Sequence, residues 1–217
     1  MDTFYAGSPL KPRRPLPFPA NRHSYFRASS GFSLIEVLVS IVVLTFGLLG
    51  MVGMQAASLH ANRDARLQSS AVVLSRELAD MIRGNKAIGV LSGTANPYLG
   101  TFSSPLAAAT PSYCLNVASG TCTDTTDIAN AQMTEWLARV DAELPSARVV
   151  SCFDTAPFDS SGLPQWGCTG GAGAVIVIKI GWTRGSTNKS QTGSAAVERA
   201  TDTNSKPALV LPVTAGV

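Results

Sequence analysis

The stretch GFSLIEVLVSIVVLTFGLLGM, residues 31–51, is apolar enough to enter a bilayer and carries one carboxylate, Glu36, near its start. An acidic group at membrane depth costs about 2.5–3.5 kcal/mol on insertion scales. An anchor alone would leave this position apolar, so the carboxylate requires a partner. The alternative is a glutamate at the headgroup boundary, where its cost is small.

The apolar run is long enough for one membrane crossing. Residues 28–62 carry no formal charge other than Glu36, and residues 37–54 would rise about 27 Å as a helix. This length is close to the hydrocarbon thickness of a bilayer. A secretory signal cleaved after the run is the weaker interpretation, because the run is long for the apolar region of such a signal.

The formal net charge of the 217-residue chain is +3, but the basic residues are unevenly spread. The first 31 residues hold five Lys or Arg and one Asp, a net +4, which leaves −1 for the remainder. Residues 9–19, PLKPRRPLPFP, predict a disordered tail rather than a basic folded surface, so no nucleic acid is indicated as a partner. Basic residues before the apolar run predict a cytoplasmic N-terminus and an exported C-terminal part.

Gly31, Phe32 and Glu36, between the basic tail and the apolar run, resemble the leader junction of type IV pilins and pseudopilins. Four features coincide there: a basic leader, a glycine before the cut, an aromatic new N-terminus and a glutamate at its fifth position. The resemblance extends over about residues 30–83. It implies removal of residues 1–31 by a prepilin peptidase and N-methylation of Phe32. It also implies that Glu36 faces the N-terminal amine of a neighbouring subunit and sets the register of assembly.

Residues 32–54 are expected to form the membrane or fibre-core half of a long helix, and residues 55–84 its amphipathic half. Gly47, Gly50 and Gly53 either soften the first half or permit close packing of helices. Gly84-Asn85 predicts the end of the helix. One apolar stripe at spacings of four and three predicts the side that meets the head: Leu67, Ala71, Leu74, Leu78 and Met81 or Ile82.

Residues 85–217 are expected to form a globular head. Residues 85–126 predict a loop, and residues 127–144 a helix with Asp127 or Thr126 as its N-cap and Trp136 as a core anchor. Strands are expected from Ala147, Ala174 and Pro207, the last at a sheet edge because of its prolines, and residues 184–196 predict a polar connection. The fold class is therefore α+β: a long N-terminal helix packed on a small antiparallel sheet, resembling the pilins.

The four cysteines all lie in the part expected to be exported, where disulfides are favoured. Their spacing fits no metal or redox motif. Of three possible connectivities, the local one is favoured, because disulfides between nearby cysteines stabilise loop-rich segments most. It joins Cys114 to Cys122 and Cys152 to Cys168, and free buried thiols are the alternative.

No catalytic residue, metal site or cofactor is predicted. His60 is the only histidine after the expected cut and lies beside the membrane segment, where it cannot serve a Ser-His-Asp arrangement. The glycines at 170–173 lack a phosphate-binding context. The scattered carboxylates do not have the spacing of a calcium-binding EF-hand loop; they are Asp124, Asp127, Asp154 and Asp159.

The function expected from the resemblance is that of a non-enzymatic minor pilin that primes assembly of a type IV pilus and supports twitching and attachment. Its expected partners are other minor and major pilins, the prepilin peptidase and, before assembly, membrane lipid. It would reside in the inner membrane as a single-pass protein and then in the fibre. A minor pseudopilin of a type II secretion system is the nearest alternative. A membrane-anchored periplasmic enzyme or ligand-binding domain is the alternative from another class.

Overall fold

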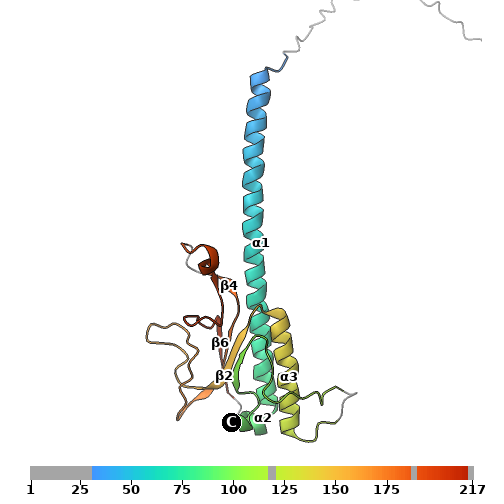
Figure 1. Ribbon diagram of the computed structural model, residues 1–217, viewed down its shortest axis with the longest axis vertical. Helices are drawn as coiled ribbons and strands as arrows, with labels where there is room; N and C mark the ends of the chain where they lie inside the picture. Colours follow the sequence, from blue (N-terminus) through green and yellow to red (C-terminus); the bar gives the residue numbers. More distant parts are fainter. Residues whose placement is uncertain (1–30, 117–120, 187–189, 215–217) are drawn as a thin grey trace, which may run out of the picture. The chain divides into compact units, whose positions relative to one another are not determined.

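A computed structural model describes residues 31–116, 121–186 and 190–214 (Figure 1). The predicted disordered tail and nearly all of the expected leader lie outside these residues. The chain divides into two compact units, residues 1–51 and 52–217, and each is described by itself.

The long helix, α1 (Leu34–Gly84), has 51 residues and contains no proline. It starts where Ser33 offers two acceptors: its carbonyl accepts the N–H of Glu36 at 3.0 Å and of Val37 at 3.2 Å, and its hydroxyl accepts the N–H of Ile35 at 3.4 Å. These bonds satisfy N–H groups that have no partner within the helix. The helix ends at Gly84, as its sequence predicts, and the short α2 (Lys86–Gly89) follows.

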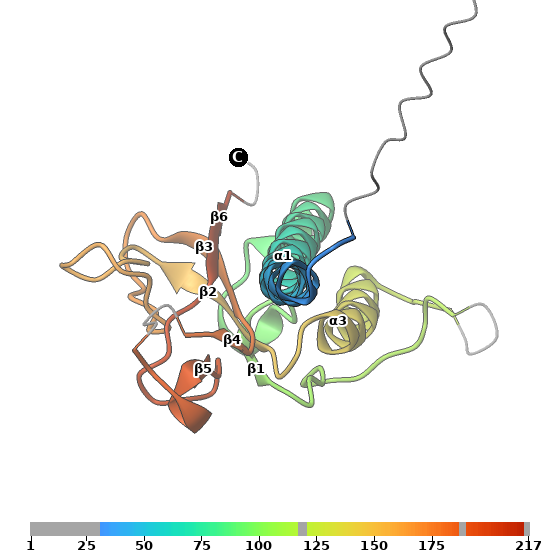
Figure 2. The same cartoon turned by 90° about the horizontal axis from the view of Figure 1, so that it is seen from above.

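The second unit is an α+β head, as expected. A four-stranded antiparallel sheet has the order β1 (Gly100–Ser103), β2 (Arg148–Asp154), β3 (Val175–Gly181) and β6 (Leu209–Val213). The two views agree that α3 (Thr125–Glu143) and the adjoining part of α1 cover one face of this sheet (Figures 1 and 2). β6 lies at an edge, as its prolines predict.

The core forms where the two helices meet the sheet. Alternate residues of β3, Ile176, Ile178 and Ile180, belong to this core and are almost fully buried. The predicted stripe of α1 is confirmed at Ala71, Leu74, Leu78 and Ile82, while Leu67 and Met81 are partly buried. Trp136 from α3 is fully buried, and its indole N–H donates to the Leu74 carbonyl at 2.9 Å. Trp136 is therefore the core anchor that the sequence predicts.

The opposite face of the sheet is covered by loops. Trp166 lies so close to Gly181 that a Cβ at this glycine would be 2.9 Å from the ring. The indole N–H of Trp166 donates to the Ser205 hydroxyl at 3.1 Å, and the Arg148 guanidinium lies 4.4 Å from the ring centroid. The central strands β2 and β3 thus have no exposed residue, with helices on one side of the sheet and loops on the other.

Two sequence-based predictions about local structure are wrong. Residues 85–126 are not simply loop, because they contain α2, a 3₁₀ turn (Gly93–Ala95) and β1. β1 is only four residues long and has Gly and Ser at its ends, so its two strand-forming residues give a weak signal, and its pairing with β2 and the burial of Phe102 make it a strand. The predicted polar connection likewise contains β4 (Arg184–Gly185), which pairs with β5 (Val197–Glu198), and the 3₁₀ turn Gly193–Ala196.

The start of α3 also differs from its prediction. Asp124 is the N-cap, and its carboxylate accepts the N–H of Thr126 at 2.7 Å and of Asp127 at 2.8 Å. Asp127 instead lies in the first turn, where it accepts hydrogen bonds from Thr123. Several residues of the segment can act as caps, and the chain uses Asp124, which lies upstream of both predicted candidates.

Trp136→Ala is expected to lower the free energy of unfolding of the head by about 3–5 kcal/mol, because it leaves a cavity in the core. Urea unfolding of the detergent-solubilised protein, followed by circular dichroism, measures the loss. The exposed Val73 on α1 provides a control, since Val73→Ala is expected to stay within about 0.5 kcal/mol of the wild type. Equal losses in the two variants would contradict the role of Trp136.

Candidate functional site

The expected cleavage junction lies in an exposed, non-helical segment. Residues 31–33 precede α1, and Phe32 is 82% exposed. No described atom lies within 4 Å of the position that a Cβ would take at Gly31. A protease could therefore approach the bond between Gly31 and Phe32 without unwinding the helix.

Glu36 lies in the first turn of α1, exposed, beside the junction. Its charge is favourable there because the N-terminus of a helix carries a partial positive charge. Within the described part of the chain, no side chain or amine forms an ion pair with its carboxylate. A shallow groove runs past it, lined by Phe32, Glu36, Val37, Ser40, Ile41 and Leu44. This arrangement could accept a cationic group from outside the chain.

The other polar side chains of the apolar half are satisfied within the helix. The Ser40 hydroxyl donates to the Glu36 carbonyl at 2.7 Å, and the Thr45 hydroxyl donates to the Val42 carbonyl at 2.8 Å. Unsatisfied polar groups cost several kcal/mol in hydrocarbon, so these bonds permit burial in lipid. Glu36 is the exception among the described residues of this half.

The N-terminal half of α1 presents apolar side chains all round. Leu34, Leu44, Phe46 and Leu49 are each more than 60% exposed. The helix is long and apolar enough to cross a membrane, judged by its length and composition. Its exposed apolar surface suits this segment to a membrane anchor.

The head contains two disulfides, which have the predicted local pairing. Cys114 is joined to Cys122 and Cys152 to Cys168, with Cα atoms 5.0 and 6.3 Å apart. The first closes the segment before α3, and the second attaches the loop after β2 to that strand.

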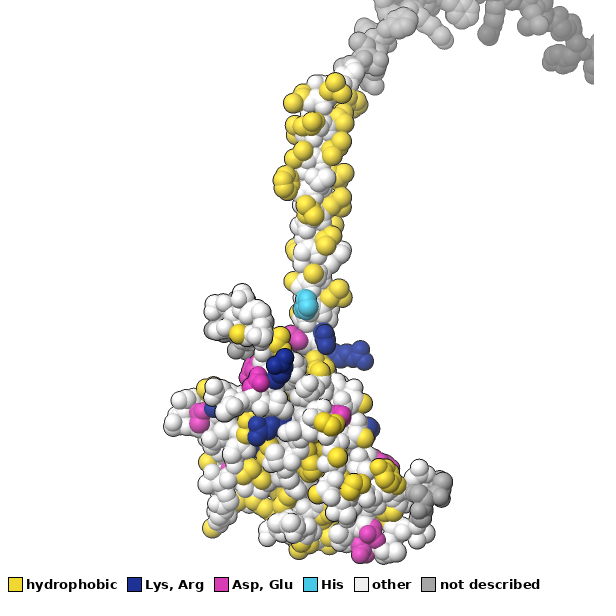
Figure 3. Space-filling model, viewed as in Figure 1, with side chains coloured by type: hydrophobic (Ala, Val, Ile, Leu, Met, Phe, Trp, Pro, Cys, Tyr) yellow, Lys and Arg dark blue, Asp and Glu magenta, His cyan; other side chains and the backbone are white. Residues whose placement is uncertain are grey.

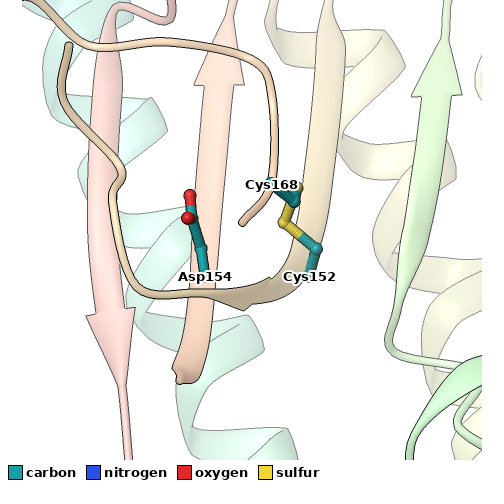
Figure 4. Close-up of side chains that lie close together, drawn as sticks. All are labelled: Cys152, Asp154 and Cys168. Carbon is teal, nitrogen blue, oxygen red and sulfur yellow. A yellow bond between two sulfur atoms is a disulfide. The ribbon is translucent and has the colours of Figure 1, made fainter. Parts of the chain in front are cut away.

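A cluster of Cys152, Asp154 and Cys168 has the residue types of a metal site but not its chemistry. Potential ligand atoms of the three residues lie within 4.8 Å of one another. Figure 4 shows the two sulfur atoms bonded to each other beside the Asp154 carboxylate. Metals are bound by thiolates, so a disulfide removes two of the three ligands.

Asp154 instead forms a buried ion pair with Lys179, which lies in the centre of β3. The Lys179 ammonium lies 2.6 Å from a carboxylate oxygen of Asp154, and neither side chain has exposed surface. The other oxygen accepts the N–H of Ala156 and of Thr169, each at 2.9 Å. Lys179 also donates to the carbonyl of Gly167. One buried pair thus holds both ends of the covering loop.

Burial raises the pKa of Asp154, but the hydrogen bond from Lys179, those from the backbone and the lysine charge outweigh this effect. The net result is a pKa below the ordinary value. Sequence reasoning treated Asp154 as a scattered carboxylate and did not single out Lys179. The available signal was one lysine in the otherwise apolar strand AVIVIKI. A strand this apolar is expected to be buried on both faces, and lysine is almost never buried unless it is paired.

The remaining predicted or rejected site residues have local structural roles. Asp159 accepts the N–H of Ser161 and of Leu163 and pairs with Lys206 at 3.1 Å. Asp124 and Asp127 serve the start of α3. His60 is exposed on α1.

Comparison with known proteins gives one match. A family model described as the prokaryotic N-terminal methylation motif matches residues 26–52, which include the junction and most of the apolar run. No curated protein and no solved structure matches the chain. The match supports a type IV pilin-like or pseudopilin-like N-terminal segment.

Lys179→Met is expected to lower the free energy of unfolding by about 3–5 kcal/mol at pH 7, because Asp154 would keep a buried charge without its partner. Asp154→Asn combined with Lys179→Met should recover most of this loss, since Asn can still accept from Ala156 and Thr169. Urea unfolding followed by tryptophan fluorescence measures the free energy of unfolding of the wild type, the single variant and the double variant. The exposed pair of Arg83 and Asp80 is the control, and Arg83→Met should change stability by about 0–1 kcal/mol. A double variant no better than Lys179→Met would contradict the interpretation.

The lowered pKa of Asp154 predicts how stability depends on pH. A carboxyl with a lower pKa in the folded state stabilises fully above its unfolded value, near 3.8, and this contribution is lost as pH falls through the folded pKa. Unfolding free energies measured between pH 6 and pH 2 should therefore fall more steeply for the wild type than for Asp154→Asn. Parallel curves would show that Asp154 has the same pKa in both states.

Proposed function

We propose that this chain, with its prepilin methylation motif, is a minor subunit of a type IV pilus, similar to the pilus modification protein PilV. The supporting observation is the motif itself, placed on an exposed junction that leads directly into an apolar helix of membrane length. In this proposal the protein primes assembly, enters the fibre, supports twitching and attachment, and catalyses no reaction.

Maturation would consist of one cut and one methylation. The prepilin peptidase removes residues 1–31 by hydrolysing the bond between Gly31 and Phe32, and the new Phe32 amine is then N-methylated. The open space around Gly31 and the non-helical backbone before Leu34 support this step. A glycine at the cut suits a protease that must approach the backbone closely.

Glu36 would act as the assembly residue. A carboxylate that is costly in lipid becomes favourable when it meets a cation in the same low-dielectric surroundings. The terminal amine of a neighbouring subunit is such a cation, and the groove beside Glu36 gives it access. A pair between this amine and Glu36 would fix the axial register of adjacent helices.

The proposed location follows from charge and disulfides. Five basic residues in the first 31 would hold the N-terminus in the cytoplasm. Residues 55–217 would then be periplasmic, where the two disulfides of the head are favoured. Before assembly the protein is a single-pass inner-membrane protein whose neighbours are lipids; afterwards its neighbours are minor and major pilins.

A minor pseudopilin of a type II secretion system would use the same junction, anchor and glutamate. The methylation motif supports this second candidate as well. Deletion of the gene in its native host separates the two: loss of pili with normal secretion supports the pilus subunit, and loss of secretion with normal pili supports the pseudopilin.

Gly31→Val is expected to reduce maturation about tenfold or more, which corresponds to about 1.4 kcal/mol of lost transition-state stabilisation. The branched side chain would obstruct the approach of the peptidase to the backbone. Immunoblots of the native host's membranes distinguish the long and short forms. Ser30→Val, next to the expected cut, is the control and should be processed far better. Normal maturation of Gly31→Val would place the junction elsewhere.

Glu36→Ala is expected to be processed normally but to be incorporated into sheared fibres about tenfold less or worse, because close charge pairs contribute about 1.5–7 kcal/mol where measured. Ser40→Ala, one turn further along the same groove, is the matched control and should assemble normally. If Glu36→Ala were incorporated normally, the Glu36 carboxylate of the wild type would have no partner in the fibre and would lie at the headgroup boundary.

A further inference from the structure

Two arginines lie on α1 beyond its apolar surface. Leu59 is the last strongly exposed large apolar residue before Arg63, and it is 70% exposed. Arg63 lies four residues later, about 6 Å along the helix, and nine residues, about 13 Å, beyond Met54. The polar layer on each side of a bilayer is about 5–8 Å thick, and arginine side chains extend towards it. The Arg63 side chain can therefore extend into the headgroup layer, and Arg66, about 18 Å beyond Met54, lies at the outer side of this layer.

Both arginines are exposed, and neither forms an ion pair within the described residues. Figure 3 shows Lys and Arg side chains projecting close to the histidine, where the apolar surface of the helix gives way to polar residues. A guanidinium that has no carboxylate partner can bind a phosphate with two parallel hydrogen bonds.

The two arginines line a hollow of about 520 Å³ whose far side is acidic. α1 contributes Arg63, Arg66, Leu67 and Ser70, and the end of α3 contributes Ala142 and Glu143. The C-terminal end of a helix carries a partial negative charge, and the last turn of α3 has no basic residue to neutralise it. The hollow thus has a cationic side and an anionic side.

We propose that this hollow binds the headgroup of an aminophospholipid, with its phosphate on Arg63 and Arg66 and its primary ammonium on Glu143. Charge complementarity selects this occupant. A purely anionic headgroup would place no cation against Glu143. A choline headgroup carries a cation that has no N–H to donate to the carboxylate.

The consequence concerns the membrane-anchored chain before assembly. A bound headgroup would hold this end of the helix at a fixed depth in the leaflet nearest the head. The proposal requires only that α1 be in a bilayer, so it stands or falls independently of the pilus function.

The test uses the full-length chain in mixed vesicles of phosphatidylethanolamine, phosphatidylcholine and phosphatidylglycerol in equal amounts, followed by extraction and native mass spectrometry of retained lipids. Phosphatidylethanolamine should be retained about fivefold over each of the others, the factor expected for one surface charge contact. Arg63→Gln with Arg66→Gln should abolish retention of all three at this site. Glu143→Gln should remove the preference for phosphatidylethanolamine over phosphatidylcholine.

Arg76→Gln with Lys86→Gln is the matched control, because it removes two exposed charges more than 30 Å of helix rise beyond Met54. This variant should retain lipid as the wild type does. Preference for phosphatidylglycerol, equal retention of the three lipids, or equal loss in the control would each overturn the proposal. All variants carry the same residues 1–31, so the basic charges of that segment are constant.

Discussion

The apolar surface of α1 between Leu34 and Met54 cannot remain in water. Its large side chains are mostly more than half exposed, and burying one such side chain stabilises by about 1.5–3 kcal/mol. A helix that is apolar all round must lie in lipid or among other helices. The hydroxyls of Ser40 and Thr45 are bonded within the helix, so both surroundings are compatible with this half of α1. Glu36 is the residue whose energy differs most between lipid and a fibre that supplies a cation.

The head is stabilised by contacts of its own and does not depend on those surroundings. Trp136 joins α3 to α1, and the isoleucines of β3 complete the core. On the other face of the sheet, the pair of Asp154 and Lys179 and the disulfide from Cys152 to Cys168 hold one loop in place. Under the proposed function, a head of this kind would keep its fold when the surroundings of the anchor change from membrane to fibre.

Much of this structure is predictable because single elements have strong periodic signals. The stripe from Ala71 to Ile82 identifies the buried side of α1, and the β-branched runs identify β2 and β3. β1 is not predictable in this way, because its four residues become a strand through pairing with β2, 45 or more residues later. The ion pair of Asp154 and Lys179 is not predictable for a related reason. Their pairing depends on strand register, which places two residues 25 positions apart on one face of the sheet.

In the candidate site, too, features formed by residues close in sequence are predictable, and features formed by distant residues are not. Gly31, Phe32 and Glu36 are recognisable because they lie close together in the sequence at a fixed spacing, and the family model matches that segment. The two disulfides are predictable because each closes a short loop, of 8 and 16 residues in sequence separation. The hollow beside Arg63 and Arg66 is not predictable, since Glu143 comes to it from another helix.

The most direct test of the central claim is the intact mass and N-terminal fragment of the protein purified from its native host's membrane or sheared-fibre fraction. Prepilin processing predicts a chain that begins at N-methylated Phe32. A chain that retains Met1 through Gly31 would contradict it and leave α1 as a plain membrane anchor.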